Sequence, residues 1–338
     1  MNSLMKKIIR FTLLIQLVFA FITVKAQESS SLKWIKVDSL FGSLPSSLHV
    51  YTSHDPLDGK PNIAYYVIAD LSDKKLHFTV DTTLGRRLTP LQFYTKNEQP
   101  AIVVNCTFFS FGTNQNLNTV IKEGKQVGYT VHSIAGKGKD TLTYRHPLGS
   151  ALGITAKRKA DIAWLYTDSS ARWPSAWDYP VAFRKDSNAA FHISYKEMKK
   201  ILPAEGSCVP SGKVFKKWKM ETAVGGGPVL VKDGKVCISN NAELKFTGNA
   251  INDKHPRTAM GYTRDNKLII LTVEGRNPGI AEGATLIQQA KILADLGCVE
   301  ALNLDGGGSS CLLVNGKETI WPSDKGNQRP VPAVFIIK

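Results

Sequence analysis

Two acidic residues, Asp305 and Glu274, stand directly after strand-like runs in the last third of the chain. Asp305 follows the alternating run 300–304, and Glu274 follows the apolar run 268–273. A pair of carboxylates is what cleavage of a glycosidic bond usually requires. One group then acts as acid or base, and the other as nucleophile or as stabiliser of an oxocarbenium-like transition state.

The segment between the two carboxylates predicts a helix that brings them together. Thr285 and Gln288 form a capping box, and Gly297 suits the position just after a helix end. A strand–helix–strand crossover makes the two strands parallel. We therefore expect Glu274 and Asp305 at the same edge of one sheet.

The turn after Asp305 offers backbone N–H groups with no Cβ atoms beside them, which lets an anionic oxygen approach. These groups belong to Gly306, Gly307 and Gly308, and Ser309 adds one further backbone N–H. The turn lacks the spacing and the lysine of a nucleotide-binding P-loop. Gly-rich segments are more often just tight turns, but the preceding Asp and the strand–helix context favour a binding role. Arg257 could clamp a phosphate with its guanidinium, the alternative being a surface ion pair.

Further polar residues accompany these strand ends. Asn105 and Thr107 follow the buried run 101–104, and Asn303 shares a strand face with Asp305. We expect these three side chains to contact the substrate. Serine hydrolase chemistry is not expected, because no Gly-x-Ser-x-Gly motif occurs. Cys106 lacks a neighbouring His that would make it a nucleophile.

Short alternating runs separated by turn residues fill most of the remaining chain. They predict an α+β fold, with strand-rich mixed sheets flanked by a few helices in a single globular domain over residues 27–338. Asn315-Gly316 is a strong hairpin signal, and 191–202 resembles a short helix. An irregular insertion is expected at about 112–219. Its tryptophans belong either to the core or to a sugar-binding cleft: Trp164, Trp173, Trp177 and Trp218.

The first 26 residues have the features of a secretory signal peptide, with an n-region containing Lys6, Lys7 and Arg10 before an apolar run. We therefore expect export to the periplasm or the extracellular space. The apolar run 11–24 is too short to span a membrane, so stable membrane insertion is not expected. The full chain carries a net charge of +15. This charge suits an anionic substrate or surface, or else only keeps the protein soluble. Nucleic acid is not an expected partner, because no basic run with interleaved aromatics occurs.

No residue pattern predicts a metal or a cofactor. The five cysteines show no CxxC spacing, and we expect most of them to be small core residues. No His/Asp cluster has metal-ligand spacing. A divalent cation such as calcium, bound by backbone and carboxylate oxygens, would leave no clear sequence pattern.

Five segments together resemble the phosphodiester glycosidase domain family, and the similarity extends from about residue 48 to 337. These segments are Asn105 to Phe109, Gly226 to Leu230, Pro256 to Gly261, Glu274 to Arg276 and Ala301 to Ser309. The resemblance implies cleavage of a sugar from a sugar-1-phosphodiester, with free sugar and a phosphomonoester as products. It also implies a site that includes the carboxylates, Arg257 and the glycine turn.

Two of these segments depart from the family pattern. Cys106 and Thr107 stand where the family usually has two glycines, and Glu274 stands where Asp is frequent. These departures concern the substrate more than the fold. Two alternatives stay open, namely a non-catalytic module that binds anionic polysaccharide and a metal-dependent phosphodiesterase that cuts the P–O bond.

Overall fold

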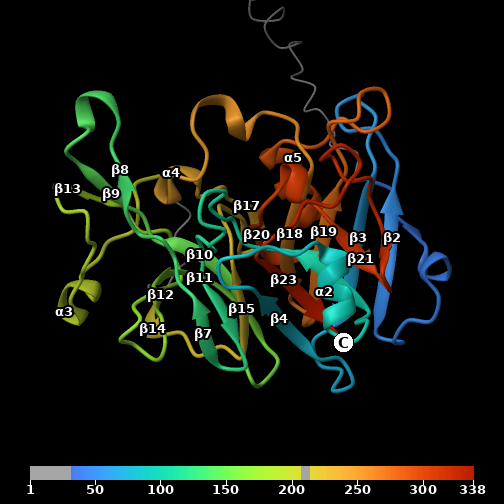
Figure 1. Ribbon diagram of the computed structural model, residues 1–338, viewed down its shortest axis with the longest axis horizontal. Helices are drawn as coiled ribbons and strands as arrows, with labels where there is room; N and C mark the ends of the chain where they lie inside the picture. Colours follow the sequence, from blue (N-terminus) through green and yellow to red (C-terminus); the bar gives the residue numbers. More distant parts are fainter. Residues whose placement is uncertain (1–31, 207–213) are drawn as a thin grey trace, which may run out of the picture. The chain divides into compact units, whose positions relative to one another are not determined.

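The computed structural model describes residues 32–206 and 214–338, so the predicted signal peptide lies outside the described residues (Figure 1). The described chain forms four antiparallel sheets with few helices, which confirms the strand-rich α+β prediction. None of the helices in these two ranges is long and apolar enough to cross a membrane.

The largest sheet positions both carboxylates. In spatial order its strands are β1 (Ile35–Lys36), β2 (Leu48–Ser53), β3 (Ala64–Asp70), β19 (Lys267–Val273), β18 (Arg257–Thr263), β20 (Cys298–Asn303), β16 (Val229–Lys232) and β17 (Lys235–Val236). β18 is antiparallel to both β19 and β20. β19 and β20 are therefore parallel, as predicted, although β18 lies between them.

Helix α5 (Leu286–Asp295) connects β19 to β20 and covers the outer face of this sheet (Figure 1). Its capping box is present, since the Thr285 side chain accepts from the Gln288 N–H. Gly297 has φ +82°, the left-handed backbone that glycine adopts at a helix end. The helix buries Leu286, Ala290 and Leu293 in the same cluster as β19 side chains. This packing fixes the length and direction of the crossover.

A five-stranded sheet supplies the Asn105 segment. In spatial order it contains β22 (Lys317–Glu318), β21 (Leu312–Val314), β5 (Ile102–Asn105), β23 (Ala333–Ile337) and β4 (Phe78–Thr82). The predicted hairpin at Asn315-Gly316 joins β21 to β22, and both turn residues have positive φ. Helix α2 (Pro90–Lys96) packs Phe93 against the outer face of this sheet.

The described strands of the segment 112–219, together with β15 that follows it, form two further sheets. The seven-stranded sheet contains β14 (Phe215–Lys217), β12 (Ser175–Trp177), β11 (Ala160–Tyr166), β10 (Gly149–Ile154), β15 (Thr222–Gly225), β6 (Val120–Lys122) and β7 (Lys125–Gly128). The three-stranded sheet contains β13 (Arg184–Asp186), β9 (Tyr144–His146) and β8 (Ile134–Ala135). Helices in the described chain also include α3 (Tyr195–Met198), which is shorter than the predicted 191–202, and α4 (Asn240–Glu243).

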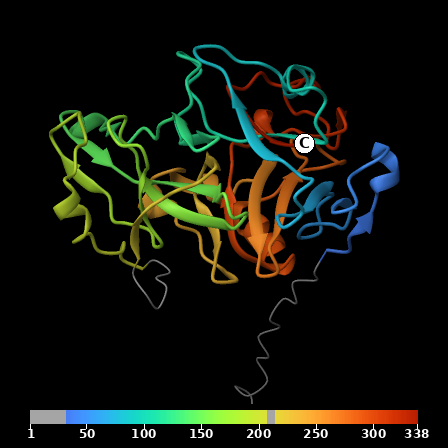
Figure 2. The same cartoon turned by 90° about the horizontal axis from the view of Figure 1, so that it is seen from below.

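One hydrophobic core joins the three larger sheets. It contains Val67 of β3, Val104 of β5 and Trp164 of β11, all fully buried. In Figure 2 the green strands of the seven-stranded sheet lie beside the orange strands of the eight-stranded sheet, where β10 and β11 contact β20. Trp177 and Trp218 are also fully buried, while Trp173 is partly exposed. Three of the four tryptophans of the insertion therefore serve packing.

Candidate active site

Asp305 lies at the junction of the two sheets that were expected to contribute to the site. Its backbone N–H donates to the Cys106 carbonyl at 2.8 Å, and its carbonyl accepts from Asn105 Nδ2 at 2.6 Å. The ends of β5 and β20 are thus joined by direct hydrogen bonds. The structure brings together polar clusters that are 200 residues apart in the sequence.

Asn105 makes this junction with its whole side chain. Besides Nδ2, its Oδ1 accepts from Thr258 Oγ1 at 2.9 Å and from the Cys311 N–H at 3.0 Å. The side chain is fully buried. Both ends of the amide are therefore engaged within the protein, and Asn105 positions the Asp305 backbone.

The environment of Asp305 favours its protonated form. Burial raises the pKa of Asp305 to about 7, while the Ser309 side chain, the Arg329 guanidinium and the Gly306 N–H act in the opposite direction. A buried carboxyl group loses hydration that its charged form needs more than its neutral form does. Asp305 can therefore exchange a proton near neutral pH, as a general acid or base must.

Two arginines lie against the glycine turn. A Cβ atom at Gly307 would lie 2.9 Å from Arg276 Nη2, and one at Gly308 would collide with Arg329 Nη2. Gly307 has φ +61°, a left-handed backbone that favours glycine, whereas a side chain at Gly308 would require the Arg329 guanidinium to move. The turn itself is a short 3-10 helix, η4 (Gly307–Ser309).

The amides of the turn are partly used within the protein. The Gly307 N–H donates to the Pro256 carbonyl at 2.8 Å, and the Ser309 N–H donates to the Gly306 carbonyl at 3.2 Å. The Gly306 amide and the Arg329 guanidinium both act on the Asp305 carboxyl group, while Arg276 lies against Gly307.

Arg257 and His255 extend the cationic character of this region. Arg257 is 3% exposed, and it donates from Nε to the Ala284 carbonyl at 2.9 Å and from Nη2 to the Asp253 carbonyl at 2.8 Å. Burial, together with Arg276, lowers the pKa of Arg257 to about 10. Burial, Arg257 and Arg276 also lower the pKa of His255. His255 Nδ1 lies 3.5 Å from Arg276 Nη2.

Glu274 stands at the same sheet edge as Asp305. One of its oxygens accepts from Asn277 Nδ2 at 3.2 Å, and the other accepts from the Trp321 N–H at 2.8 Å. Both oxygens therefore act as acceptors, which is how a carboxylate bonds. Because β18 lies between β19 and β20, the two strand ends are about 10 Å apart, two inter-strand spacings. The Trp321 side chain beside Glu274 is 61% exposed.

The other predicted contact residues are buried. Thr107 donates from Oγ1 to Asn116 Oδ1. Asn303 donates from Nδ2 to the Gly227 carbonyl at 2.9 Å, while its buried Oδ1 has no hydrogen-bond partner. Burial raises the pKa of the Cys106 thiol to about 12, which keeps it from acting as a thiolate nucleophile at neutral pH.

The cysteines largely meet the expectation of a core role. Cys106, Cys298 and Cys311 are buried free thiols, and Cys237 is disulfide-bonded. Within residues 32–206 and 214–338, no three His, Cys, Asp or Glu side chains are grouped in a way that could hold a metal ion.

Arg276 and Arg329 were not among the residues that the sequence singled out for the site. Arg276 directly follows Glu274-Gly275. Its position beside a carboxylate at a strand end could therefore have indicated a place in the site. Arg329 lies 24 residues after Asp305 in sequence, and only the loop between β22 and β23 brings it back. The bond from its Nε to Asp324 Oδ2 at 3.0 Å links two residues of that loop.

Comparisons with known proteins identify the family. The profile of the phosphodiester glycosidase family matches residues 98–338. An uncharacterized SPbeta prophage-derived protein of Bacillus subtilis is 41% identical over 88 residues, 26% of this chain and 13% of that protein. Bovine N-acetylglucosamine-1-phosphodiester alpha-N-acetylglucosaminidase is 33% identical over 103 residues, 28% of this chain and 19% of that enzyme. The chain thus spans less than a fifth of either relative.

Solved structures share the fold across most of the chain. A hypothetical protein from Synechocystis has a TM-score of 0.55 and 17% identity, covering 90% of this chain and 67% of that one. A second similar structure is the catalytic domain of zebrafish N-acetylglucosamine-1-phosphodiester alpha-N-acetylglucosaminidase, auto-inhibited by its pro-peptide. It has a TM-score of 0.53 and 19% identity, covering 91% of this chain and 88% of that one. The family profile matches more than two thirds of this chain. The chain therefore belongs to the phosphodiester glycosidase family.

Proposed function

We propose that the protein hydrolyses the glycosidic bond of a sugar-1-phosphodiester in an extracellular or cell-envelope glycan and releases free sugar and a phosphomonoester. The observation that carries the proposal is the position of Arg276 and Arg329 over the glycines that follow Asp305, whose pKa is raised to about 7. Two cations suit the phosphate, and a carboxyl group that titrates near neutral pH suits acid–base chemistry.

The proposed reaction is hydrolysis at the anomeric carbon. Water attacks the anomeric carbon, the bond from that carbon to the phosphate oxygen breaks, and the phosphomonoester leaves with the bonding electrons. Asp305 takes the proton from the water. The leaving phosphate needs little proton donation, because the second pKa of a phosphate monoester is about 6. Arg276 and Arg329 stabilise its charge, and Glu274 supports the oxocarbenium-like transition state.

The other predicted residues take supporting roles in this proposal. Asn105 positions the Asp305 backbone through its hydrogen bond to the Asp305 carbonyl. Arg257 orders the loop before α5 through its hydrogen bond to the Ala284 carbonyl. Asn303 offers its unpartnered Oδ1, and Thr107 helps to order the segment that follows β5. Gly306, Gly307, Gly308 and Ser309 keep the backbone close to the two guanidinium groups. We further propose export through the segment 1–26.

The direct test is incubation with the methyl phosphodiester of N-acetylglucosamine-1-phosphate in water enriched in oxygen-18. We expect free sugar together with methyl phosphate that carries no label, because the bridging oxygen stays on the phosphate. We also expect a loss of at least about 100-fold in kcat for Asp305→Asn, within the usual range for general acid–base groups. Glu274→Gln should also be strongly impaired. The matched controls are Asp295→Asn and Glu98→Gln, which change exposed carboxylates outside the site.

The alternatives give different products. Label in the phosphate, with sugar-1-phosphate as product, would indicate a phosphodiesterase that cuts the P–O bond and would overturn the proposal. Absence of turnover across several sugar diesters, with measurable binding of anionic glycans, would instead indicate a binding module. The rate is expected to rise with pH through about 7 in the wild type, because Asp305 must be deprotonated to act as a base.

A further inference from the structure

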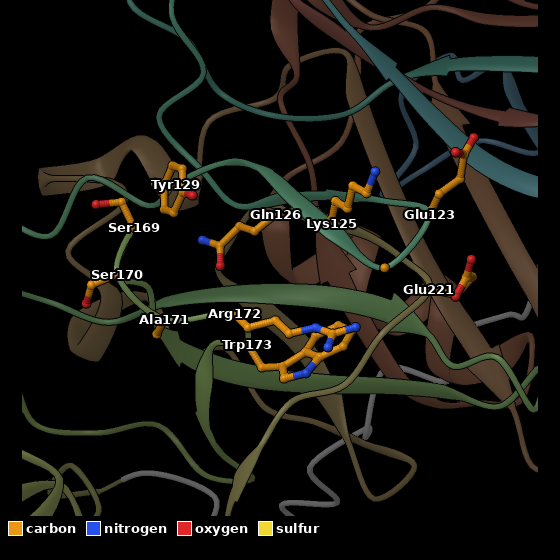
Figure 3. Close-up of a pocket in the computed structure, with 11 residues that line it drawn as sticks. Glu123, Lys125, Gln126, Tyr129, Ser169, Ser170, Ala171, Arg172, Trp173 and Glu221 are labelled. Atoms are coloured by element: carbon orange, nitrogen blue, oxygen red, sulfur yellow. The ribbon is translucent and has the colours of Figure 1, made fainter.

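A pocket lies at the insertion, and none of its lining residues belongs to the candidate active site. It has a volume of about 800 Å³. The turn between β6 and β7 forms one wall, the loop 169–173 after β11 forms another, and Glu221 lies just before β15 (Figure 3). We name it the hairpin pocket.

The walls of the hairpin pocket are held by hydrogen bonds within the protein. The Gly124 N–H donates to the Glu221 carbonyl at 2.9 Å, which ties the hairpin turn to the strand that follows. On the opposite side, Asp168 Oδ1 accepts from the Ser170 N–H at 2.8 Å and from Ser170 Oγ at 2.9 Å. The pocket is therefore preformed, so a ligand would lose little affinity to ordering these loops.

Two aromatic side chains line the pocket. Trp173 is partly exposed, and the Arg172 guanidinium lies 5.2 Å from its ring centre, which orients the indole. Tyr129, on the facing segment, is 39% exposed (Figure 3). Aromatic rings combine a flat apolar body with a polar edge. Flat rings of this kind suit the C–H face of a pyranose.

The charges around these rings balance. Glu123 and Glu221 contribute two negative charges, and Lys125 and Arg172 contribute two positive charges. The pocket thus has many hydrogen-bond donors and acceptors without an excess of either charge. This favours a neutral ligand rich in hydroxyl or amide groups over a phosphate or a polyanion.

We propose that the hairpin pocket binds neutral pyranose units of a glycan chain. The inference rests on the proposed function, because it assigns to the same enzyme a substrate that is held at two places. The anionic diester binds at Asp305, and a neutral part of the same glycan binds beside Trp173. The pocket then raises affinity for long glycans and leaves turnover of a small diester unchanged.

Calorimetric titration with two neutral probes, N-acetylchitopentaose and maltopentaose, tests the pocket without catalysis. We expect at least one probe to bind, with about tenfold weaker binding for Trp173→Ala, which corresponds to about 1.4 kcal/mol. Tyr129→Ala should also weaken binding. Because this side chain lies at the surface, Tyr129→Ala tests the pocket even where Trp173→Ala fails to fold. Phe183→Ala is the matched control, since Phe183 is exposed and lines neither the hairpin pocket nor the adjoining pocket that shares Trp173.

Two variants separate glycan binding at the hairpin pocket from turnover at Asp305. Arg276→Ala should lose turnover of the small methyl diester and keep oligosaccharide binding, whereas Trp173→Ala should show the reverse. If neither probe binds, or if Trp173→Ala and Tyr129→Ala bind as tightly as the wild type, the hairpin pocket is not a glycan site. This result would leave the activity at Asp305 to be judged by the labelled-water experiment alone.

Discussion

At the scale of single residues, the chemistry of Asp305 depends on its surroundings more than on its identity. The sequence showed that a carboxylate precedes three glycines, but it did not show the burial that raises its pKa to about 7. Burial arises because Asp305 is joined to β5 through Asn105 and Cys106, and these contacts span 200 residues. Such a pKa follows from tertiary packing, which no local pattern encodes.

The raised pKa of Asp305 makes the stability of the protein depend on pH. The folded state binds this proton more tightly than the unfolded state, whose carboxyl group has the ordinary pKa of 3.8. The resulting stability is fully present below about pH 4 and is lost as the pH rises to about 7, by about 4 kcal/mol. Asp305→Asn removes the titrating group, so its melting temperature relative to wild type should be higher at pH 8 than at pH 4.

Thermal unfolding at these two pH values measures this effect. Asp295→Asn, at an exposed carboxylate, should show no comparable change with pH. An equal difference between Asp305→Asn and wild type at both pH values would mean that Asp305 does not titrate between them.

At the scale of elements, the sequence predicted the features that depend on neighbouring residues, namely helix caps and tight turns. The capping box of α5, its C-terminal glycine and the Asn315-Gly316 hairpin are all present in the structure. The sequence analysis did not predict α2, although Thr89 caps this helix, Pro90 begins it and Gln92 completes its capping box. This helix has only seven residues, too few for a clear apolar periodicity.

The strands of the insertion were harder to predict for a related reason. Their lengths vary from two to seven residues, and buried residues occupy both faces of strands such as β10. A strand that is buried on both faces shows no alternation of apolar and polar residues. Long-range pairing, and not local pattern, therefore orders this part of the chain.

The α5 capping box offers a test at this scale. Thr285→Ala removes the hydroxyl oxygen that accepts the Gln288 N–H, and we expect a loss of about 1 kcal/mol in unfolding free energy. Urea titration measures this loss, and Lys291→Ala on the exposed side of α5 is the control. Turnover should fall little, because α5 joins the two strands without touching the glycine turn. Unchanged stability would show that the cap contributes nothing to the crossover.

At the scale of the whole molecule, Asn105 connects elements from three parts of the chain. Its amide bonds to Thr258 of β18, to Asp305 just beyond β20 and to Cys311 just before β21. Asn105→Ala would leave several buried donors and acceptors without partners, at a cost of about 3 kcal/mol. Denaturant unfolding measures this cost. Asn241→Ala, exposed in α4, should change stability by less than about 0.5 kcal/mol. Equal effects of both substitutions would contradict the role of Asn105 as a junction.

The pairing of β5 also has a consequence for how the protein is made. β5 is synthesised as residues 102–105, but its neighbours β21 and β23 begin only at Leu312 and Ala333. At about 5–20 residues per second, the ribosome needs about 10–40 s to supply them. During that time the apolar strand has two open edges that can pair with other chains. A newly made chain is therefore expected to need shielding from its neighbours until β23 has been synthesised.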